Sequence, residues 1–322
     1  MLRHWPKVLN RRYSSHPAST GMIRSLTIAD LYAKYHAKEP ISMVTAYDFI
    51  TANWAQSAGC DVVLVGDSLA TCALGYDSTN QIGLEEFRYH VQAVCRAPGP
   101  AFVLVDMPFG SFESSIQQGI ETAIAFMKSS ARVGGVKIEV GSPVGQGESQ
   151  KQDYSLQLAA ELCSRGIPVM GHVGLTPQRA HFLSGFKVQG SKSAKDAAAI
   201  YHTAQQLQDI GCFSVLLECV PHKVSSYITQ RLSVPTIGIG AGLGVNGQVL
   251  VQSDILGMTP HAVPKLAHKY GDLNSESIGL IKRYANDVSE QKFPDNNKNG
   301  FKIKDDIWAE FLEHVNAGPR NE

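Results

Sequence analysis

Short apolar runs recur along the chain between residue 41 and about residue 256, separated by longer segments of mixed polarity. Within each run nearly every position is apolar, without the strict alternation of a sheet that has one face in water. Near-continuous apolar runs are typical of parallel strands that are covered on both faces. The eight runs predicted to be strands are Ile41–Ala46, Val62–Gly66, Phe102–Met107, Val136–Val140, Ile167–Gly171, Val215–Val220, Thr236–Ile239 and Val249–Gln252.

The segments between these runs carry apolar residues at helical spacing. Leu84, Phe87, Val91 and Val94 follow this spacing, and so does the segment Ile116–Met127. Roughly eight strand–helix units therefore occupy about 215 residues, which is the usual span of a (β/α)8 barrel. We predict an α/β protein of this class, a TIM barrel. A doubly wound parallel sheet is the structural alternative.

Residues 1–24 differ in composition from the rest of the chain. They contain five basic residues and no acidic residue, and serines and a threonine follow the basic part. A basic, hydroxyl-rich and acid-free N-terminus is typical of a mitochondrial transit peptide. We therefore predict a transit peptide at residues 1–24 and a location in the mitochondrial matrix. A disordered tail on a cytoplasmic protein is the alternative.

We expect the remaining chain to divide into the (β/α)8 barrel at residues 25–291 and a tail at residues 292–322. A helical pattern over Ser275–Glu290 is predicted to complete the barrel. The sequence of Pro294–Gly300 is polar and predicts a linker. The amphipathic pattern of Asp305–Val315 then predicts an accessory helix, to which we assign no chemistry.

Composition narrows the classes of partner. The chain of 322 residues is 43% hydrophobic and 18% charged, and its 29 basic residues balance 29 acidic ones. Binding to nucleic acid needs an excess of positive charge, so zero net charge argues against nucleic acid as the main partner. The longest uncharged stretch, Leu232–Ser253, is rich in glycine and contains a proline. We expect a loop there rather than a membrane span.

Polar residues stand where the predicted strands end. Asp67 and Asp106 end the second and third strands, Glu139 lies in the fourth, His172 follows the fifth, and Glu218 lies in the sixth. In a (β/α)8 barrel the reactive groups cluster at the C-terminal ends of the strands. A single acid at a strand end caps the following helix about as often as it has a functional role. Several acids that converge on one mouth, however, repel one another unless a cation or a proton neutralises them.

The types of these side chains favour magnesium over zinc. Carboxylates are hard oxygen donors, and one histidine without a cysteine cannot build a zinc site. Asp67, Asp106 and Glu139 are therefore the candidate ligands of Mg²⁺. Lys137 lies two residues before Glu139 on one strand, so both side chains project to the same face. This places a cation suited to a substrate carboxylate beside the metal.

The roles of Glu218 and His172 are less sharply defined by the sequence. Glu218 lies across the predicted barrel and is a candidate for proton transfer, with a supporting hydrogen-bond acceptor as its alternative role. His172 is expected either to contact the residues that bind the metal and substrate or to form hydrogen bonds with backbone groups near the mouth. The sequence GLGVNG at residues 242–247 matches the dinucleotide fingerprint GxGxxG. No helix pattern follows it, so a glycine loop close to a ligand is the better interpretation.

Eight segments form a combination with high specificity. They are TAYD (45–48), LVGDSL (64–69), GYDST (75–79), VKIE (136–139), GHVGLTPQ (171–178), KVQG (187–190), LLECV (216–220) and IGIGAG (237–242). In these segments, and in their order over about residues 30–270, the chain resembles the ketopantoate hydroxymethyltransferase family. It departs from the family's pattern at Val140, where a glycine is usual, and in a longer loop at residues 141–152. The tail beyond about residue 292 has no bacterial counterpart.

The resemblance implies a (β/α)8 barrel of the phosphoenolpyruvate-mutase/isocitrate-lyase type. It also implies a homo-oligomer, which is a decamer in related proteins. For the site, it implies Mg²⁺ on Asp67, Asp106 and Glu139, keto-acid contacts from Asp67, Ser68, Asp106 and Lys137, and Glu218 as the catalytic acid/base.

The implied reaction transfers a hydroxymethyl group from 5,10-methylenetetrahydrofolate to 3-methyl-2-oxobutanoate and gives 2-dehydropantoate. Mg²⁺ on the keto acid would make its C3 proton more acidic, and a base would then assist formation of the enolate that attacks the folate methylene. A Mg²⁺-dependent C–C lyase on the same barrel is one alternative, because fold does not fix function. A non-catalytic ligand-binding barrel is the other, although such a protein has no need of the full set of acids and lysine.

Overall fold

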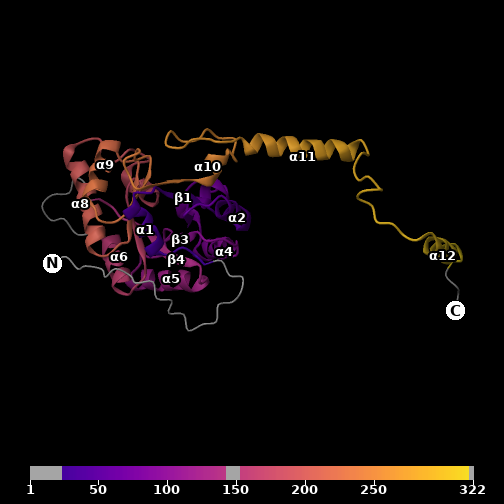
Figure 1. Cartoon of the computed structure of the whole chain (residues 1–322), viewed down its shortest axis with the longest axis horizontal. Helices are drawn as coiled ribbons and strands as arrows, with labels where there is room; N and C mark the ends of the chain where they lie inside the picture. The colour runs from indigo at the N-terminus through magenta and orange to yellow at the C-terminus, as the bar shows by residue number, and fades with distance from the viewer. Residues whose placement is uncertain (1–23, 143–152, 319–322) are drawn as a thin grey trace. The chain divides into compact units, whose positions relative to one another are not determined.

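Eight parallel strands close into a barrel in the order of the sequence (Figure 1). The computed structural model describes residues 24–142 and 153–318. The last strand pairs in parallel with the first, Ile41 opposite Gly247, and this pairing closes the barrel. The strands are β1 (Ile41–Thr45), β2 (Val62–Val65), β3 (Phe102–Asp106), β4 (Val133–Glu139), β5 (Val169–Gly174), β6 (Ser214–Glu218), β7 (Thr236–Ile239) and β8 (Gly247–Leu250).

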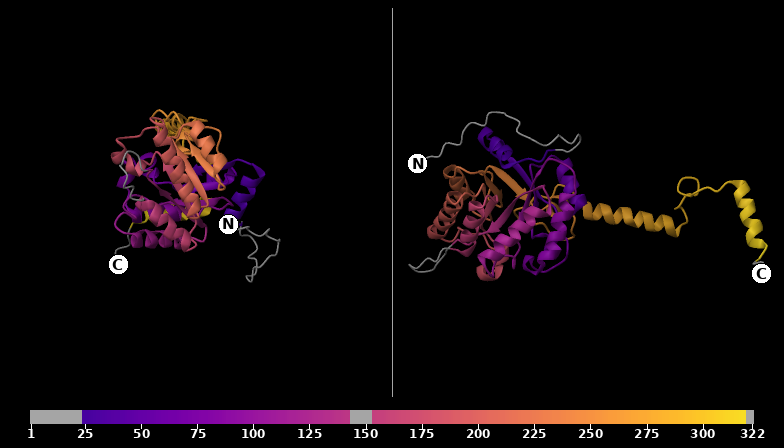
Figure 2. Two further views of the ribbon diagram at one scale, coloured as in Figure 1. Left: turned by 90° about the vertical axis from the view of Figure 1, so that its left-hand side faces the viewer. Right: turned by 90° about the horizontal axis from the view of Figure 1, so that it is seen from below.

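Helices surround the barrel and connect its strands (Figure 2). Several begin at a capping side chain, such as Asp48 before α2 and Ser115 before α5, which accepts a hydrogen bond from a free backbone N–H. The helices of the barrel region are α1 (Ile28–Ala37), α2 (Phe49–Ser57), α3 (Leu69–Cys72), η1 (Thr79–Gln81), α4 (Leu84–Cys95), α5 (Ile116–Ser129), α6 (Tyr154–Ser164), η2 (Pro177–Arg179), α7 (Ala180–Leu183), α8 (Ala194–Asp209), α9 (His222–Arg231) and α10 (Gln252–Leu256).

The barrel seam depends on a residue without a side chain. A Cβ atom at Gly247 would lie 2.4 Å from the carbonyl oxygen of Ile41. That distance is far inside normal contact, so any larger residue would push β8 away from β1. The GxGxxG match therefore ends in a glycine that lets two strands meet.

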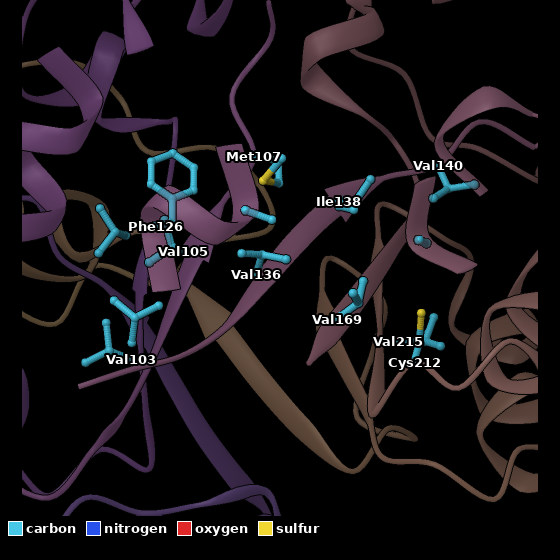
Figure 3. Close-up of a cluster of buried hydrophobic side chains, with 14 of the residues drawn as sticks. Val103, Val105, Met107, Phe126, Val136, Ile138, Val140, Val169, Cys212 and Val215 are labelled. Atoms are coloured by element: carbon cyan, nitrogen blue, oxygen red, sulfur yellow. The ribbon is translucent and has the colours of Figure 1, made fainter. Parts of the chain in front are cut away.

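Alternate residues of each strand belong to two different cores. Val62 and Leu64 of β2 belong to the inner cluster, whereas Val63 and Val65 belong to the larger outer cluster shared with the helices. Part of the outer cluster is shown in Figure 3, where Phe126 of α5 lies among the strand valines. The predicted pattern of strands covered on both faces is confirmed.

Every predicted strand except the seventh differs from the observed bounds by one to three residues at one end or both, and one difference moves a site residue. The fifth strand was predicted at Ile167–Gly171 with His172 after it, but β5 runs from Val169 to Gly174. Pro168 has no N–H to donate, so the ladder starts only after it. His172 therefore lies inside β5. The eighth strand ends at Leu250, and Gln252 begins α10.

The C-terminal residues form a second compact unit made of Leu256–Ala262 and Lys269–Glu322. It contains α11 (Leu273–Ser289) and α12 (Asp305–Asn316), at the positions where helices were predicted. That the first of these helices completes the barrel stays a prediction. The strands close by the β8–β1 pairing, and α11 belongs to the second unit.

Two sequence predictions concern other parts of the chain. The proposed transit peptide lies outside the described residues apart from Arg24, so it stays a prediction. Within the described residues, no helix is both long and apolar enough to span a membrane.

A partly buried ion pair joins α1 to the N-terminal end of the barrel. Both carboxylate oxygens of Asp61 lie 2.8 Å from Lys34 Nζ, and one accepts hydrogen bonds of 2.8 Å from Ser42 N and Oγ. Burial alone would raise the pKa of Asp61, but these hydrogen bonds and the charge of Lys34 outweigh burial and lower it. A carboxylate with a lowered pKa stabilises the fold only while it is ionised.

Asp61→Asn should lower the free energy of unfolding by about 1–3 kcal/mol at pH 7, because an amide cannot accept all of these hydrogen bonds. The pKa of Asp61 in the folded protein lies below its unfolded value of about 4. The difference in free energy of unfolding between wild type and variant is therefore at its full size at pH 5 and becomes smaller as the pH falls below about 4. Urea unfolding between pH 7 and pH 3.5 measures it, with exposed Asp209→Asn as control. A constant difference across that range would contradict the ionic role of Asp61.

Candidate active site

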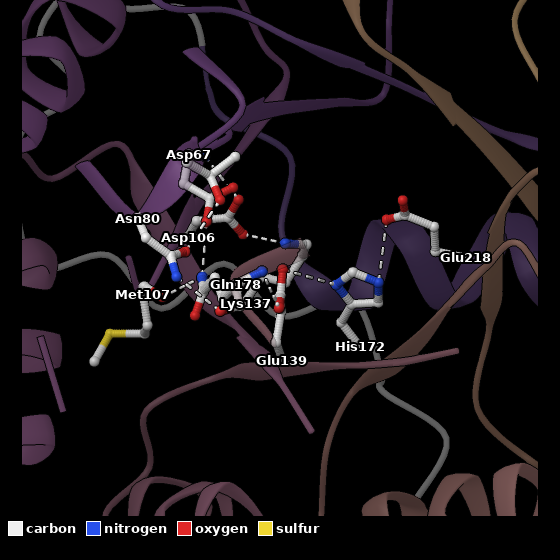
Figure 4. A network of polar contacts seen from close by, with 10 residues as sticks. Asp67, Asn80, Asp106, Met107, Lys137, Glu139, His172, Gln178 and Glu218 are labelled. Atoms are coloured by element: carbon white, nitrogen blue, oxygen red, sulfur yellow. Dashed lines mark hydrogen bonds and ion pairs between the residues drawn. The ribbon is translucent and has the colours of Figure 1, made fainter. Parts of the chain in front are cut away.

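The two-residue alternation along the strands brings the predicted polar residues into one place. Phe102 and Leu104 of β3 point into the barrel, so Asp106 does too, and Lys137 and Glu139 of β4 lie on the face opposite to that of Ile138. The same rule places His172 of β5 and Glu218 of β6 inside. Figure 4 shows these side chains converging at the C-terminal ends of the strands. The predicted cluster is present.

An ion pair between Asp106 and Lys137 forms the centre of the site. Lys137 Nζ donates to Asp106 Oδ1, and both side chains are almost fully buried. The other oxygen of Asp106 accepts a 3.0 Å hydrogen bond from the backbone N–H of Asp67. Burial lowers the pKa of Lys137, but the attraction of Asp106, Asp67 and Glu139 outweighs it and raises the pKa. Lys137 is therefore a permanent cation inside the barrel.

Two further carboxyl groups lie near this pair without a cation of their own. Burial and then the charge of Asp106 raise the pKa of Asp67 to about 7. Burial and then the charge of Asp67 raise the pKa of Glu139 well above its usual value. Both shifts have the cause expected of acids crowded in a dry site. Three carboxyl groups thus face a single lysine.

Ser68 lies at the edge of the same cluster. It precedes α3, but its hydroxyl caps no backbone N–H of that helix. A Cβ atom placed on Gly66 would lie 3.2 Å from Ser68 Oγ and 3.5 Å from Asp106 Oδ2. The hydroxyl and the carboxylate therefore lie close together on the same side of Gly66.

Gln178 connects the acids and was not singled out as a site residue from the sequence. Its Nε2 donates to Asp67 Oδ2 at 2.8 Å and to the carbonyl of Met107 at 2.9 Å. Its backbone N–H donates to Glu139 Oε2 at 3.0 Å. The one signal in the sequence was its place in the motif GHVGLTPQ, directly after the proline that opens η2. Gln178 holds Asp67 and Glu139 at a fixed separation.

His172 lies between two glutamates. Its Nε2 is 3.2 Å from Glu218 Oε2 and its Nδ1 is 3.8 Å from Glu139 Oε1. Burial lowers the pKa of His172, so the ring is neutral at neutral pH and carries one N–H. The contact with Glu218 agrees with a supporting role, and it connects Glu218 to the acid cluster.

Glu218 is the last residue of β6, and its side chain is the more exposed partner of this contact, at 16%. The next residue, Cys219, has a backbone φ of +50°, a conformation that side chains other than glycine rarely adopt. On the other side, a Cβ at Gly174 would lie 2.2 Å from the carbonyl oxygen of Glu218. The chain therefore turns sharply where Glu218 faces the mouth.

The donor set of this cluster fits a hard divalent cation. Asp67, Asp106 and Glu139 are all buried, and Lys137 balances only one of their charges. Such an excess of carboxylate oxygen suits Mg²⁺. In the described residues, however, no three His, Cys, Asp or Glu side chains are grouped tightly enough to share one ion. Sharing an ion requires these three side chains to turn toward one another.

The departure at Val140 does not reach the site. Its side chain is fully buried in the outer cluster, on the face opposite to that of Glu139. Its backbone N–H donates to the carbonyl of His172 at 2.8 Å, which continues the ladder between β4 and β5. Most of the longer loop after it, residues 143–152, lies outside the described residues.

Solved structures of other barrel enzymes share this fold. A phosphonopyruvate hydrolase, solved with oxalate and Mg²⁺, superposes with a TM-score of 0.54 at 10% identity, covering 92% of this chain and all of the other. A phosphoenolpyruvate phosphomutase from Streptomyces platensis subsp. rosaceus gives 0.52 at 12% identity, with the same coverage. These likenesses concern the fold alone, and they confirm the predicted barrel type.

Sequence comparison is more specific. A yeast 3-methyl-2-oxobutanoate hydroxymethyltransferase from Saccharomyces cerevisiae is 52% identical over 92% of this chain and 93% of its own length. The enzyme of the same name from Carboxydothermus hydrogenoformans is 41% identical over 88% of this chain and 97% of its own. The sequence profile of the ketopantoate hydroxymethyltransferases matches residues 25–296. The chain belongs to the ketopantoate hydroxymethyltransferase family.

Proposed function

We propose that this chain transfers a hydroxymethyl group from 5,10-methylenetetrahydrofolate to 3-methyl-2-oxobutanoate, giving 2-dehydropantoate and tetrahydrofolate with the uptake of one water. The names of relatives that match over nearly their whole length support the reaction. The observation that carries the proposal is the buried set of Asp67, Asp106, Lys137 and Glu139 in the barrel mouth. Such a set suits an anionic substrate with adjacent oxygens better than an apolar ligand.

Lys137 and Ser68 provide the contacts for the carboxylate of the keto acid. Lys137 is the cation of the cluster, and its ammonium group has three donors, of which Asp106 accepts one. Ser68 Oγ lies close to the Asp106 carboxylate and caps no helix. Two donors from different elements fix the orientation of a small acid, which lowers the entropic part of the barrier.

Asp67, Asp106 and Glu139 are the residues that would hold Mg²⁺. When bound, the ion supplies a Lewis acid that polarises the keto group and makes the C3 proton more acidic. Gln178 keeps two of these carboxylates apart through separate hydrogen bonds. These bonds set the separation of Asp67 and Glu139 while no ion is bound, and both side chains would turn to share one.

Glu218 is the base in this proposal. It takes the C3 proton from the keto acid and so gives the enolate. Water breaks both C–N bonds of the folate methylene, the enolate attacks the released carbon at the formaldehyde level, and tetrahydrofolate leaves. The oxygen of that water becomes the new hydroxyl group. The neutral ring of His172 lies 3.2 Å from Glu218, and the partly exposed carboxylate faces the mouth. A general base of this kind contributes about 10²–10⁴-fold to the rate.

Glu218→Gln should slow the exchange of the C3 proton of 3-methyl-2-oxobutanoate with deuterated water by at least about 100-fold, because the amide cannot accept the proton. NMR follows this exchange without any folate. Glu121→Gln on the exposed surface of α5 is the matched control and should exchange normally. Normal exchange in Glu218→Gln would remove Glu218 as the base. Full turnover without folate would instead favour the lyase.

Asp67→Asn should abolish most of the stabilisation that Mg²⁺ gives to the wild type. Bound ligand raises the melting temperature by mass action, and the variant lacks one anionic donor. Without metal the variant should melt at or above the wild-type temperature, because it loses a buried charge that its neighbours repel. Asp106 is a less suitable position for this test, because its substitution leaves Lys137 without its ion-pair partner.

Thermal unfolding with and without Mg²⁺ makes this comparison. Asp61→Asn is the matched control, because Asp61 is also a buried aspartate but lies at the other end of the barrel. Its shift with Mg²⁺ should equal that of the wild type. Equal shifts in Asp67→Asn and the wild type would show that Asp67 is not a ligand.

A further inference from the structure

A pocket of about 410 Å³ lies beside the barrel mouth and is not used by the residues assigned to the keto acid. Its walls come from the ends of β4 and β5, from η2 and α7, and from the segment that leads into α8. Pockets that hold drug-sized ligands range from about 300 to 1,000 Å³. The pocket is therefore large enough for a second, larger substrate.

The pocket is lined by neighbours of the residues in the proposed active site. Gly174, one of its lining residues, pairs in register with Glu218. Arg179, another, directly follows Gln178, which holds Asp67. The backbone N–H of Gln189 donates to the carbonyl of Cys219 at 2.9 Å and fixes the outer wall next to the proposed base. A ligand in the pocket therefore has one part beside Glu218.

The walls of the pocket are chemically divided. Phe182, Leu183, Val188 and Ile200 form an apolar part, and Phe182 and Val188 are 79% and 51% exposed. Large apolar side chains that line a pocket and remain exposed provide surface for stacking a flat ring. This part of the pocket suits an aromatic ring system rather than a five-carbon acid.

The charged part of the pocket leaves one cation available. Arg179 is engaged, since its guanidinium pairs with Asp153 at 2.6 Å and donates to Ser155 Oγ at 2.6 Å. Lys192 is exposed at the rim, and within residues 24–142 and 153–318 it has no ion pair or hydrogen bond. A lysine in this position is suited to a ligand carboxylate at the edge of the pocket.

We propose that this pocket binds the folate co-substrate. The pteridine and p-aminobenzoyl rings lie against Phe182 and Val188, and the glutamyl carboxylates reach Lys192. This orientation brings the one-carbon unit, which sits between the two ring systems, toward Gly174 and Glu218. The inference rests on the proposed function and adds to it the place of the second substrate.

Two substitutions test the two parts of the pocket. Val188→Trp fills the apolar part, and Phe186→Trp is its control, because Phe186 is a 70% exposed neighbour that does not line the pocket. Lys192→Glu reverses the rim charge, and Lys195→Glu is its control in the first turn of α8. The readout is the Kd of tetrahydrofolate, measured by calorimetry in the presence of keto acid and Mg²⁺.

Both pocket variants should weaken tetrahydrofolate binding at least tenfold, and both controls should bind within twofold of the wild type. A triglutamyl form should bind the wild type more tightly than the monoglutamyl form, and Lys192→Glu should lose most of that gain. Exchange of the C3 proton, which needs no folate, should continue in all four variants because none of these residues contacts the acid cluster.

Tetrahydrofolate affinities that stay at the wild-type value in Val188→Trp and Lys192→Glu would overturn the pocket assignment and leave the proposed function standing. Equal losses in the controls and the pocket variants would also overturn it, because the effect would then not be local. A wild type that exchanges the C3 proton but neither binds tetrahydrofolate nor transfers from its methylene form would overturn the proposed function, and the pocket assignment with it.

Discussion

The alternation of side chains along a closed set of parallel strands decides where everything else in this molecule lies. In a barrel, one residue of each successive pair must face the axis and the other must face the helices. Toward the N-terminal ends of the strands the residues that face the axis are apolar, such as Val62 and Phe102. At the C-terminal ends they are Asp106, Lys137 and Glu139. The rule that fills the core therefore also buries these charges.

Burying these charges sets the chemistry of the site. Asp106 and Lys137 neutralise each other, while Asp67 and Glu139 are left with raised pKa values in a space with little water. A site in this condition favours any cation that can join it. The acids are dehydrated when the protein folds, so this cost does not recur when a substrate enters.

Much of this arrangement could be predicted because it depends on local patterns. Near-continuous apolar runs gave the strands, and strand ends gave Asp67, Asp106, Glu139 and Glu218. Gln178 could not be predicted in the same way, because a turn carries it back over the barrel. The spacing of apolar residues does not indicate such a turn. The start of β5 was misplaced by two residues, since apolar Ile167 continues the pattern although Pro168 prevents pairing. The place of α11 depends on tertiary contacts, which its amphipathic pattern does not specify.

The two ends of the barrel have different roles, one in stability and the other in the proposed chemistry. At the N-terminal end, Leu31 of α1 closes an apolar cluster with Phe102 and Phe213, and Lys34 ties α1 to Asp61. At the C-terminal end the strands carry mutually repelling acids and a strained residue after Glu218. Substitutions at the N-terminal end should change the lifetime of the folded enzyme and the amount that accumulates in a cell. They should leave its substrate preference unchanged. Selection can therefore adjust the lifetime of this protein and its chemistry through separate sets of residues.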